Sequence, residues 1–354
     1  MTEYGGNPGR SGHTLSLAAA KKVFSCREEL CELFGVSDPS RVIFTQNTTH
    51  SLNLAIKGLL RAGDHALISD MEHNSVLRPI EKLHSDGMIE YSVFQTFPNK
   101  GRGREELIIR SIQSLIRPNT RLIALSHASN ICSATLPIKR IGDLCRAHGI
   151  LLVVDAAQSA GIMAIDAEKM NISALALPAH KALYGPQGCG ALLIANDLEM
   201  KTLTEGGSGT NSLEPFMPSD PPEKYEAGTL PTPAIAGLYE GIKFVRALGL
   251  EWIREHESEL WLYARERLMN IPHISLYAPE HVGSTLLFNK KEIAPERLAA
   301  HLDECDICVR AGYHCSPLGH KTLGTLDTGA VRASFGIFNT KKDVDMLARA
   351  LLKI

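Results

Sequence analysis

An acid and a lysine follow two apolar segments of this chain, and their placement could serve a single reaction centre. The segment 151–154 is Leu-Leu-Val-Val and leads directly into Asp155, with Gln158 close behind it. A second apolar segment, 172–177, is followed after a short interval by Lys181. Short apolar runs of this kind are typical of buried parallel strands, whose carboxyl ends meet at one edge of a sheet. Pyridoxal phosphate requires such a pair, because a lysine forms the Schiff base and an acid holds the pyridine nitrogen protonated.

A phosphate site is predicted where another strand leads into a helix. The predicted strand 41–44 is followed by Thr48 and Thr49, where a helical pattern begins. Free backbone N–H groups and the helix dipole favour an anion at such a terminus. Taken alone, Thr48 could be a simple N-cap. Beside the acid and the lysine, phosphate binding is the favoured interpretation, and His180 could also reach a phosphate oxygen.

Two further polar residues follow other predicted strands. His73 comes shortly after the predicted strand 65–68, and Asn130 follows the predicted strand 120–126. Side chains at the carboxyl edge of an open parallel sheet share one crevice, so we expect both residues to face it. His73 could stack on the cofactor ring, although an isolated histidine is more often a surface loop residue.

Strand-like and helix-like segments alternate along most of the chain. This alternation predicts an α/β fold with a mostly parallel sheet covered by helices on both faces. The proline-rich segment 217–233 predicts a border between a cofactor-binding large domain, residues 1–233, and a bridging helix with a smaller α/β domain, residues 234–354. Further predicted helices are 15–34, 48–60, 138–148 and 234–269 with a break near Gly249, and helices from Ala294 and Thr340; further predicted strands are 190–194, 274–277, 285–288 and 331–335.

Composition argues against several classes of function. The 354 residues carry a formal net charge of −2 and 44% are apolar, so we expect no nucleic-acid or membrane partner. No apolar run reaches the length of a transmembrane helix, and the polar N-terminus lacks a signal peptide's apolar core, which predicts a cytoplasmic location. The eight cysteines are expected to be thiols. Cys305 and Cys308 have the spacing of a metal or redox pair, but without a second pair we predict no metal site.

A series of ordered motifs extends through the chain: Asn7-Pro8-Gly9-Arg10-Ser11-Gly12-His13, Glu72-His73-Asn74-Ser75, Ser129-Asn130, Asp155-Ala156-Ala157-Gln158, His180-Lys181, Tyr225-Glu226-Ala227-Gly228-Thr229, Arg310-Ala311-Gly312-Tyr313-His314-Cys315 and Val331-Arg332-Ala333-Ser334-Phe335-Gly336. Together they resemble the cysteine desulfurases of the class V aminotransferase superfamily. The resemblance extends from about Gly5 to the C-terminus and implies a fold-type I, pyridoxal-phosphate-dependent enzyme.

The resemblance implies a role for each matching residue. Lys181 would carry the cofactor and move protons at the substrate, Asp155 would pair with the pyridine nitrogen, and Gln158 would bond the ring hydroxyl. The other implied contacts are stacking by His73, phosphate binding by Thr48, Thr49 and His180, a phosphate contact from Thr229 of a neighbouring subunit, and a contact of Asn130 near the ring hydroxyl. Arg332 would clamp the substrate carboxylate with its guanidinium fork, near Asn130, and Arg310 is a second candidate there.

Cys315 is the nucleophile that the resemblance implies. The expected reaction converts L-cysteine to L-alanine and leaves the sulfur on Cys315 as a persulfide, for transfer to a sulfur-acceptor protein. Only a thiolate attacks, and the neighbouring His314, Arg310 and Arg332 could favour that form. Alternatively, Cys315 is an ordinary small thiol among eight. The family forms homodimers, so we expect a homodimer here, with Thr229 and the segment 206–209 as shared parts.

This chain departs from the family pattern in three places. The family usually begins with a strand containing an Asp-Asn-Ala-Ala-Thr-type motif, which the resemblance predicts to be lacking here. Pro178 stands where a hydroxyl residue is usual, and Ala179 replaces a glycine next to the cofactor lysine. The segment 131–134 also differs. Three readings stay open: a cysteine desulfurase, a selenocysteine lyase or other class V aminotransferase-like enzyme, and a catalytically impaired or non-catalytic truncated homologue.

Overall fold

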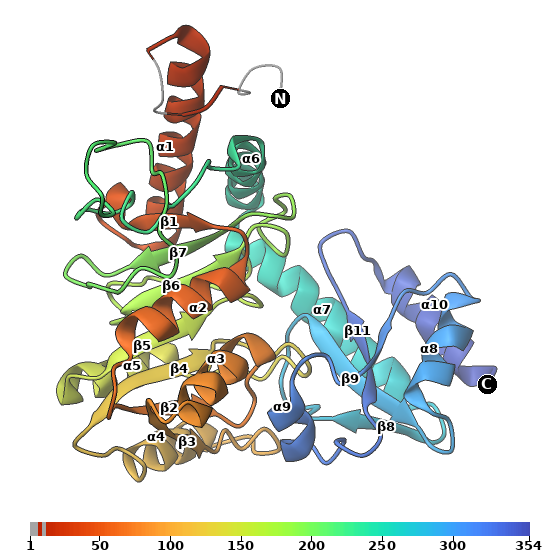
Figure 1. The fold of residues 1–354 in the computed structure, drawn as a ribbon. Coiled ribbons are helices and arrows are strands. Elements are labelled where there is room, and N and C mark those ends of the chain that lie inside the picture. Colours follow the sequence, from red (N-terminus) through yellow and green to blue (C-terminus); the bar gives the residue numbers. More distant parts are fainter. Residues whose placement is uncertain (1–5, 9–11) are drawn as a thin grey trace.

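Two sheets organise the protein in the computed structural model, which describes residues 6–8 and 12–354 (Figure 1). The larger sheet has seven strands in the order β1-β7-β6-β5-β4-β2-β3. Strands β3, β2, β4, β5 and β6 run parallel, whereas β7 is antiparallel to both β6 and β1. Its strands are β1 (Val42–Thr45), β2 (His65–Ser69), β3 (Glu90–Phe94), β4 (Thr120–Ser126), β5 (Leu151–Asp155), β6 (Ala174–Pro178) and β7 (Gly190–Ile194).

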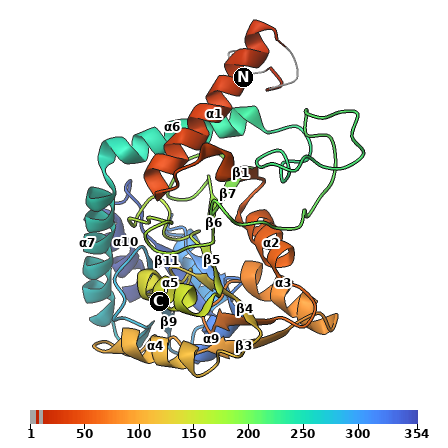
Figure 2. The same cartoon turned by 90° about the vertical axis from the view of Figure 1, so that its left-hand side faces the viewer.

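Helices cover both faces of the larger sheet, as the α/β prediction requires. Alternate residues of a strand point to opposite faces, so Leu152 and Val154 enter one core while Val153 enters the other. On the first face pack α1 (Thr14–Phe34), α4 (Arg104–Gln113), α5 (Ile138–His148) and α6 (Thr232–Leu248). On the second pack α2 (Thr48–Leu59) and α3 (Asn74–Ser85). Figure 2 shows α1 and α6 together near β1, where they contact each other.

The smaller sheet has four antiparallel strands in the order β10-β11-β9-β8. A separate core joins it to three helices, with Trp261 and Phe288 among its largest buried side chains. The elements are α7 (Leu250–Met269), β8 (Ile274–Tyr277), β9 (Thr285–Lys290), α8 (Pro295–Asp303), β10 (Arg310–Gly312), α9 (Pro317–Thr322), β11 (Ala330–Ser334) and α10 (Lys341–Leu352).

The break between α6 and α7 lies at Gly249, whose φ of 85° is a conformation that favours glycine. Before it, Ile235 and Leu238 of α6 pack into the core of the large sheet. After it, Leu260, Trp261, Ala264 and Leu268 of α7 belong to the core of the small sheet. The border at residue 233 stays a prediction; the packing changes from one core to the other at Gly249.

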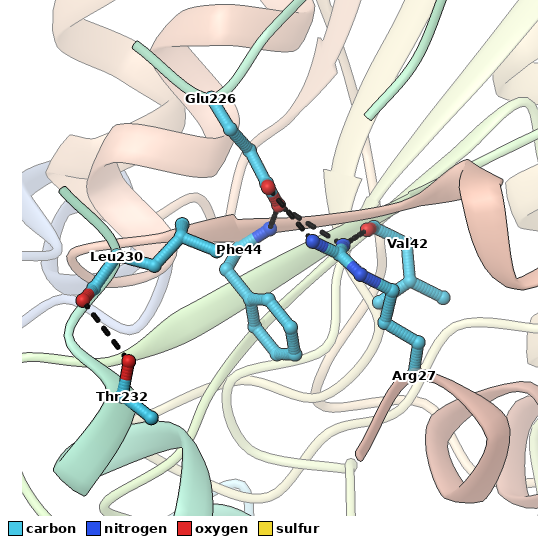
Figure 3. A network of polar contacts seen from close by, with 6 residues as sticks. All are labelled: Arg27, Val42, Phe44, Glu226, Leu230 and Thr232. Atoms are coloured by element: carbon cyan, nitrogen blue, oxygen red, sulfur yellow. Dashed lines mark hydrogen bonds and ion pairs between the residues drawn. The ribbon is translucent and has the colours of Figure 1, made fainter. Parts of the chain in front are cut away.

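Strand β1 is an edge of the large sheet, and a buried ion pair covers its open side (Figure 3). Arg27 of α1 binds Glu226 through two bonds, from Nη1 to Oε1 at 3.0 Å and from Nη2 to Oε2 at 2.7 Å. Glu226 Oε1 also accepts a hydrogen bond from Phe44 N at 2.6 Å, and Arg27 donates to the Val42 carbonyl. The pair thereby satisfies outward-facing backbone groups that have no neighbouring strand.

Within the part of the chain that the structure describes, no helix combines the length and apolar character needed to cross a membrane. The short 3₁₀ helix η1 (Pro39–Arg41) precedes β1.

Candidate active site

A pocket of about 170 Å³ lies at the carboxyl ends of the strands of the large sheet. Its walls come from the segments that follow β1, β2, β4, β5 and β6. Parallel strands bring these segments to one edge, which is why residues far apart in the sequence meet there. The predicted site residues in its lining are Thr48, Thr49, His73, Asn130, Asp155, Gln158, His180 and Lys181.

Asp155 and Lys181 form the charged centre of this pocket. Asp155 is 4% exposed, and its Oδ1 accepts a hydrogen bond from Ala157 N at 2.8 Å. Burial raises the pKa of Asp155, and the positive charge of Lys181 opposes that change. Desolvation acts in the opposite direction on an amine and lowers the pKa of Lys181, and the positive charge of Arg332 adds to this change, although part of the residue is exposed to solvent. A lowered pKa increases the fraction of neutral amine, the form that attacks a carbonyl carbon.

The N-terminus of α2 forms the opposite end of the pocket. Thr48 is buried, and its Oγ1 has no hydrogen-bond partner in the described structure. The first N–H groups of a helix also lack intrahelical acceptors. The close approach of β7 sets this terminus in place: a Cβ on Gly190 would lie 2.8 Å from the Leu177 carbonyl and 3.0 Å from Asn47. An unpartnered hydroxyl at a helix N-terminus is suited to an anion such as phosphate.

His73 caps α3 and connects to the same end of the pocket. Its Nδ1 accepts a hydrogen bond from Ser75 N at 3.0 Å and lies 2.9 Å from Ser75 Oγ. Ser75 Oγ in turn lies 2.8 Å from Thr49 Oγ1. Burial, together with the positive charges of Lys181 and Arg310, lowers the pKa of His73 to about 4, so the imidazole is neutral at pH 7.

Two arginines of the small sheet face each other beside the pocket. Arg310 of β10 and Arg332 of β11 are register partners on antiparallel strands. Directly opposed like charges repel, so an anion between or above them would be stabilising. Arg332 Nη1 donates to the carbonyl of Asn130 at 2.8 Å, and its buried Nε has no partner in the described structure. These arginines therefore offer donors for a carboxylate at the border of the two sheets.

Cys315 lies on a short loop that is bonded to the large sheet's side of the pocket. Its carbonyl accepts a hydrogen bond from Asn74 N at 2.7 Å, and the carbonyl of His314 accepts one from Asn130 Nδ2 at 2.8 Å. The side chain of Cys315 is exposed, and Arg310 Nη2 lies 3.8 Å from its sulfur. The loop thus presents an accessible thiol next to a cation.

His314 differs from its sequence-based expectation. It is 2% exposed, and its Nε2 lies 3.0 Å from the Arg310 carbonyl and its Nδ1 3.2 Å from His320 Nε2. Burial lowers the pKa of His314 to about 4, so the ring carries no charge at pH 7 that could favour a thiolate. Both ring nitrogens are already engaged away from Cys315. Of the three expected neighbours, Arg310 is the one with a contact to the Cys315 sulfur.

Some predicted residues lie elsewhere or beyond the described structure. Thr229 is exposed and is not in the lining of the pocket of its own chain; its role toward a neighbouring subunit stays a prediction. Pro178 does line the pocket, where it offers no hydroxyl. Of the segment 7–13, residues 9–11 lie outside the described residues.

Comparison with known proteins identifies the family. The model of the class-V aminotransferases matches residues 1–347. The chain belongs to the class-V aminotransferase family. It is 32% identical to a probable cysteine desulfurase from Halalkalibacterium halodurans, covering 99% of this chain and 86% of that protein. A probable cysteine desulfurase from Methanothermobacter thermautotrophicus is 31% identical, over 99% of this chain and 88% of the relative.

Solved structures agree with this assignment. The apo structure of a cysteine desulfurase from Thermococcus onnurineus has a TM-score of 0.88 and 28% identity, covering 99% of this chain and 88% of that one. A cysteine desulfurase from Escherichia coli has a TM-score of 0.86 and 25% identity, covering 97% and 86%. The predicted α/β fold of fold-type I is therefore confirmed, as is the predicted family.

Class-V aminotransferases depend on pyridoxal phosphate, and the residues of this pocket fit that cofactor. The unpartnered Thr48 hydroxyl lies where a phosphate would be bound. The buried Asp155, with a single hydrogen bond in the described structure, would gain a cationic partner in a protonated pyridine nitrogen. Lys181 supplies the amine that the cofactor aldehyde requires.

Sequence reasoning missed the polar residues that support this site. Glu72 is fully buried, and it accepts hydrogen bonds from Ser126 N at 3.0 Å and from Ser126 Oγ at 2.9 Å. Ser126 is the register partner of Asp155, so Glu72 connects the ends of β2 and β4 beside the acid. Burial raises the pKa of Glu72 to about 7. The motif around His73 contains Glu72 and Ser75, but the sequence does not indicate that these residues bind Ser126 and Thr49.

Proposed function

We propose that this chain is a pyridoxal-phosphate-dependent cysteine desulfurase that converts L-cysteine to L-alanine and takes the sulfur onto Cys315 as a persulfide. The observation that carries the proposal is the accessible Cys315 thiol, held by its own backbone beside the pocket of Lys181 and Asp155. The cysteine desulfurases among its relatives support it. A selenocysteine lyase or another class-V reaction does not require a nucleophilic thiol at this place.

The pocket residues would hold the cofactor from three sides. The N-terminus of α2, with Thr48 and Thr49, would bind the phosphate, assisted by His180. Neutral His73 would lie against one face of the ring, because an uncharged imidazole carries a smaller desolvation cost there. Asp155 would keep the pyridine nitrogen protonated, with Gln158 and Asn130 near the ring hydroxyl. When bound, pyridoxal phosphate supplies an electron sink for the pair released at the substrate α carbon.

The protein groups would then act on the substrate in order. Arg332, with Arg310 nearby, would bind the substrate carboxylate and so fix the α carbon–hydrogen bond relative to Lys181. The Lys181 amine would take the α proton and return a proton to the β carbon. The Cys315 thiolate would attack the substrate sulfur: the carbon–sulfur bond breaks and a sulfur–sulfur bond forms. The balance is cysteine plus enzyme thiol giving alanine plus enzyme persulfide, with carbon reduced and sulfur oxidised.

We infer that the enzyme acts as a homodimer and passes its sulfur to an acceptor protein or a thiol. Large apolar side chains of α1 and of the segment 206–230 are exposed in the single chain, and Leu213 and Phe216 are 100% and 82% exposed. Such patches are typical of protein interfaces.

All eight cysteines are free thiols, which supports a reducing, cytoplasmic location for the protein. Cell fractionation tests this location.

The test is alanine release from L-cysteine by the purified chain with added pyridoxal phosphate and a reductant. We expect repeated turnover by the unmodified protein. Lys181→Ala should lose both turnover and the visible absorbance of the lysine-bound cofactor. Cys315→Ala should retain that absorbance and lose sulfur transfer, and Arg332→Lys should raise KM for cysteine because a point charge replaces a two-bond fork. Normal desulfuration by Cys315→Ala would overturn the assigned nucleophile, and turnover of selenocysteine alone would favour the lyase.

A further inference from the structure

Two buried histidines lie behind the Cys315 loop and belong to no part of the cofactor pocket. The rings of His314 and His320 are stacked with 5.4 Å between their centroids and 12° between their planes. His320 and Thr325 are both 0% exposed. His320 Nδ1 lies 2.7 Å from Thr325 Oγ1, and its Nε2 lies 3.2 Å from His314 Nδ1. The chain of contacts continues from His314 Nε2 to the Arg310 carbonyl at 3.0 Å.

The direction of these hydrogen bonds follows from their last acceptor. The Arg310 carbonyl can only accept, so His314 Nε2 must carry the proton that it donates. In a neutral imidazole the other nitrogen is then an acceptor, so His320 Nε2 must donate to His314 Nδ1. By the same step His320 Nδ1 is an acceptor, and the Thr325 hydroxyl donates to it at 2.7 Å; the other acceptor within reach of that hydroxyl, the His320 carbonyl, is farther away at 3.4 Å. Burial lowers the pKa of both histidines, which is consistent with two neutral rings.

The loop that these bonds support has an unfavourable backbone conformation. His314 and Cys315 have φ values of 52° and 58°, in the left-handed region that residues with a side chain seldom adopt. Such conformations persist when surrounding contacts determine them. The contacts here come from two sets of groups: the histidine chain, which binds the His314 ring, and the Asn74 N–H and Asn130 Nδ2, which bind the carbonyls of Cys315 and His314.

We propose that His320 and Thr325 are positioning residues for the Cys315 nucleophile, acting through the ring of His314. The Thr325 hydroxyl fixes the tautomer of His320, and His320 fixes that of His314. His314 thereby stays bonded to the Arg310 carbonyl of β10, and this bond supports the left-handed turn that carries Cys315. Without the hydroxyl, His320 can exchange tautomers, and two nitrogen lone pairs then face each other. The inference deepens the proposed function and depends on it for its catalytic meaning.

The decisive comparison is Thr325→Val against Thr325→Ser in the full-length enzyme with bound cofactor. Valine keeps the shape of threonine and removes the hydroxyl, whereas serine keeps the hydroxyl and removes a methyl group. We expect Thr325→Val to lower kcat for alanine formation about tenfold, the order expected for losing one buried hydrogen bond. KM for cysteine and the absorbance of the lysine-bound cofactor should be unchanged. Thr325→Ser should retain most of kcat.

Amide exchange of Asn74 gives a readout that does not need activity. Asn74 is the first residue of α3, so its N–H has no intrahelical acceptor and is protected by the Cys315 carbonyl at 2.7 Å. We expect this amide to exchange about tenfold faster in Thr325→Val than in Thr325→Ser. His320→Gln, which keeps one donor and one acceptor, should restore part of the protection that His320→Phe loses.

The outcomes separate this inference from the proposed function. If the unmodified enzyme forms no alanine while Asn74 exchange responds as expected, the positioning is supported and the proposed reaction fails. If alanine forms but Thr325→Val matches Thr325→Ser in both kcat and Asn74 exchange, the positioning role is overturned. A Thr325→Val protein that loses cofactor absorbance as well would also overturn it, because the effect would then not be confined to the Cys315 loop.

Discussion

Removing the Glu226 carboxylate should destabilise the protein far more than removing a surface charge. The Arg27 and Glu226 side chains are 7% and 5% exposed, and Glu226 receives two bonds from Arg27 and one from Phe44 N. In Glu226→Ala the guanidinium keeps the Val42 carbonyl and the Phe44 ring, whose centroid lies 4.6 Å away, but no counter-charge within this network. The Phe44 N–H on the edge strand also loses its acceptor (Figure 3).

The magnitude follows from leaving a buried charge unpaired. Breaking a buried ion pair by removing one partner costs about 3–5 kcal/mol. Glu226→Gln keeps an acceptor for Phe44 N and for one Arg27 bond, so we expect a smaller loss of about 1–3 kcal/mol. Replacing both partners, as in Arg27→Met with Glu226→Leu, removes the unpaired charge and should recover part of the loss.

Urea unfolding of the cofactor-free protein, followed by circular dichroism, measures these differences. The matched control is Glu240→Ala, because the Glu240 side chain is 61% exposed and pairs with Lys22 at 3.4 Å and Lys243 at 3.7 Å. Exposed pairs contribute about 0–1 kcal/mol. If Glu226→Ala reduces the free energy of unfolding no more than Glu240→Ala, the argument that this pair closes the edge of the sheet is wrong.

Two further predictions concern a buried acid and the subunit interface. Glu257 is 3% exposed, its Oε2 has no partner in the described structure, and burial raises its pKa to about 7. The Glu257 carboxyl group therefore binds its proton more tightly in the folded state than in the unfolded state. The contribution of this protonated carboxyl to the free energy of unfolding is lost as the pH rises from 4.5 through 7. Urea unfolding at pH 4.5 and at pH 8 measures this effect as the free energy of unfolding of Glu257→Gln minus that of the unmodified protein. This difference should increase by up to about 3 kcal/mol from pH 4.5 to pH 8. An equal difference at both pH values would contradict the prediction. If Thr229 serves the neighbouring subunit, a hybrid dimer of one Lys181→Ala chain and one Thr229→Arg chain keeps one intact site. Mixing the two variants should then give a higher rate of alanine formation than the sum of their separate rates. Verified hybrid dimers without this gain would show that Thr229 is not part of a shared site.

The large-sheet part of the site could be predicted because strand ends are visible in the sequence. The apolar run before Asp155 and the one before Lys181 became β5 and β6, and their register places both carboxyl ends at one edge. Local patterns also predicted the bounds of most helices within a few residues. Helices α3, α4 and α9 and strands β3 and β10 did not appear among the predicted elements. Strand β3 is an edge strand with mostly polar or half-buried residues, so its apolar pattern is weak.

The supporting contacts could not be predicted, because they join residues of distant segments. Nothing local to His314 indicates that it is buried against His320 instead of facing Cys315. The same holds for Arg27 and Glu226, which are 199 residues apart in the sequence and meet at an edge strand. Side-chain pairing of this kind depends on tertiary packing, whereas sequence periodicity reports only which face of an element is buried.

The loop that carries the nucleophile is bonded to both parts of the molecule: to β10 of the small sheet through the Arg310 carbonyl, and to the segment at the start of α3. Asn74 N binds the Cys315 carbonyl, and Ser316 Oγ donates to the Glu72 carbonyl at 3.0 Å. Residues 72–74 also contain His73, which lines the cofactor pocket. The Cys315 loop is therefore attached to the same three-residue segment that carries His73, and the bond from His314 Nε2 to the Arg310 carbonyl attaches it to β10 as well. The distance between thiol and cofactor would then be set locally, by the hydrogen bonds to the start of α3 and by the histidine chain that keeps the loop in its left-handed turn.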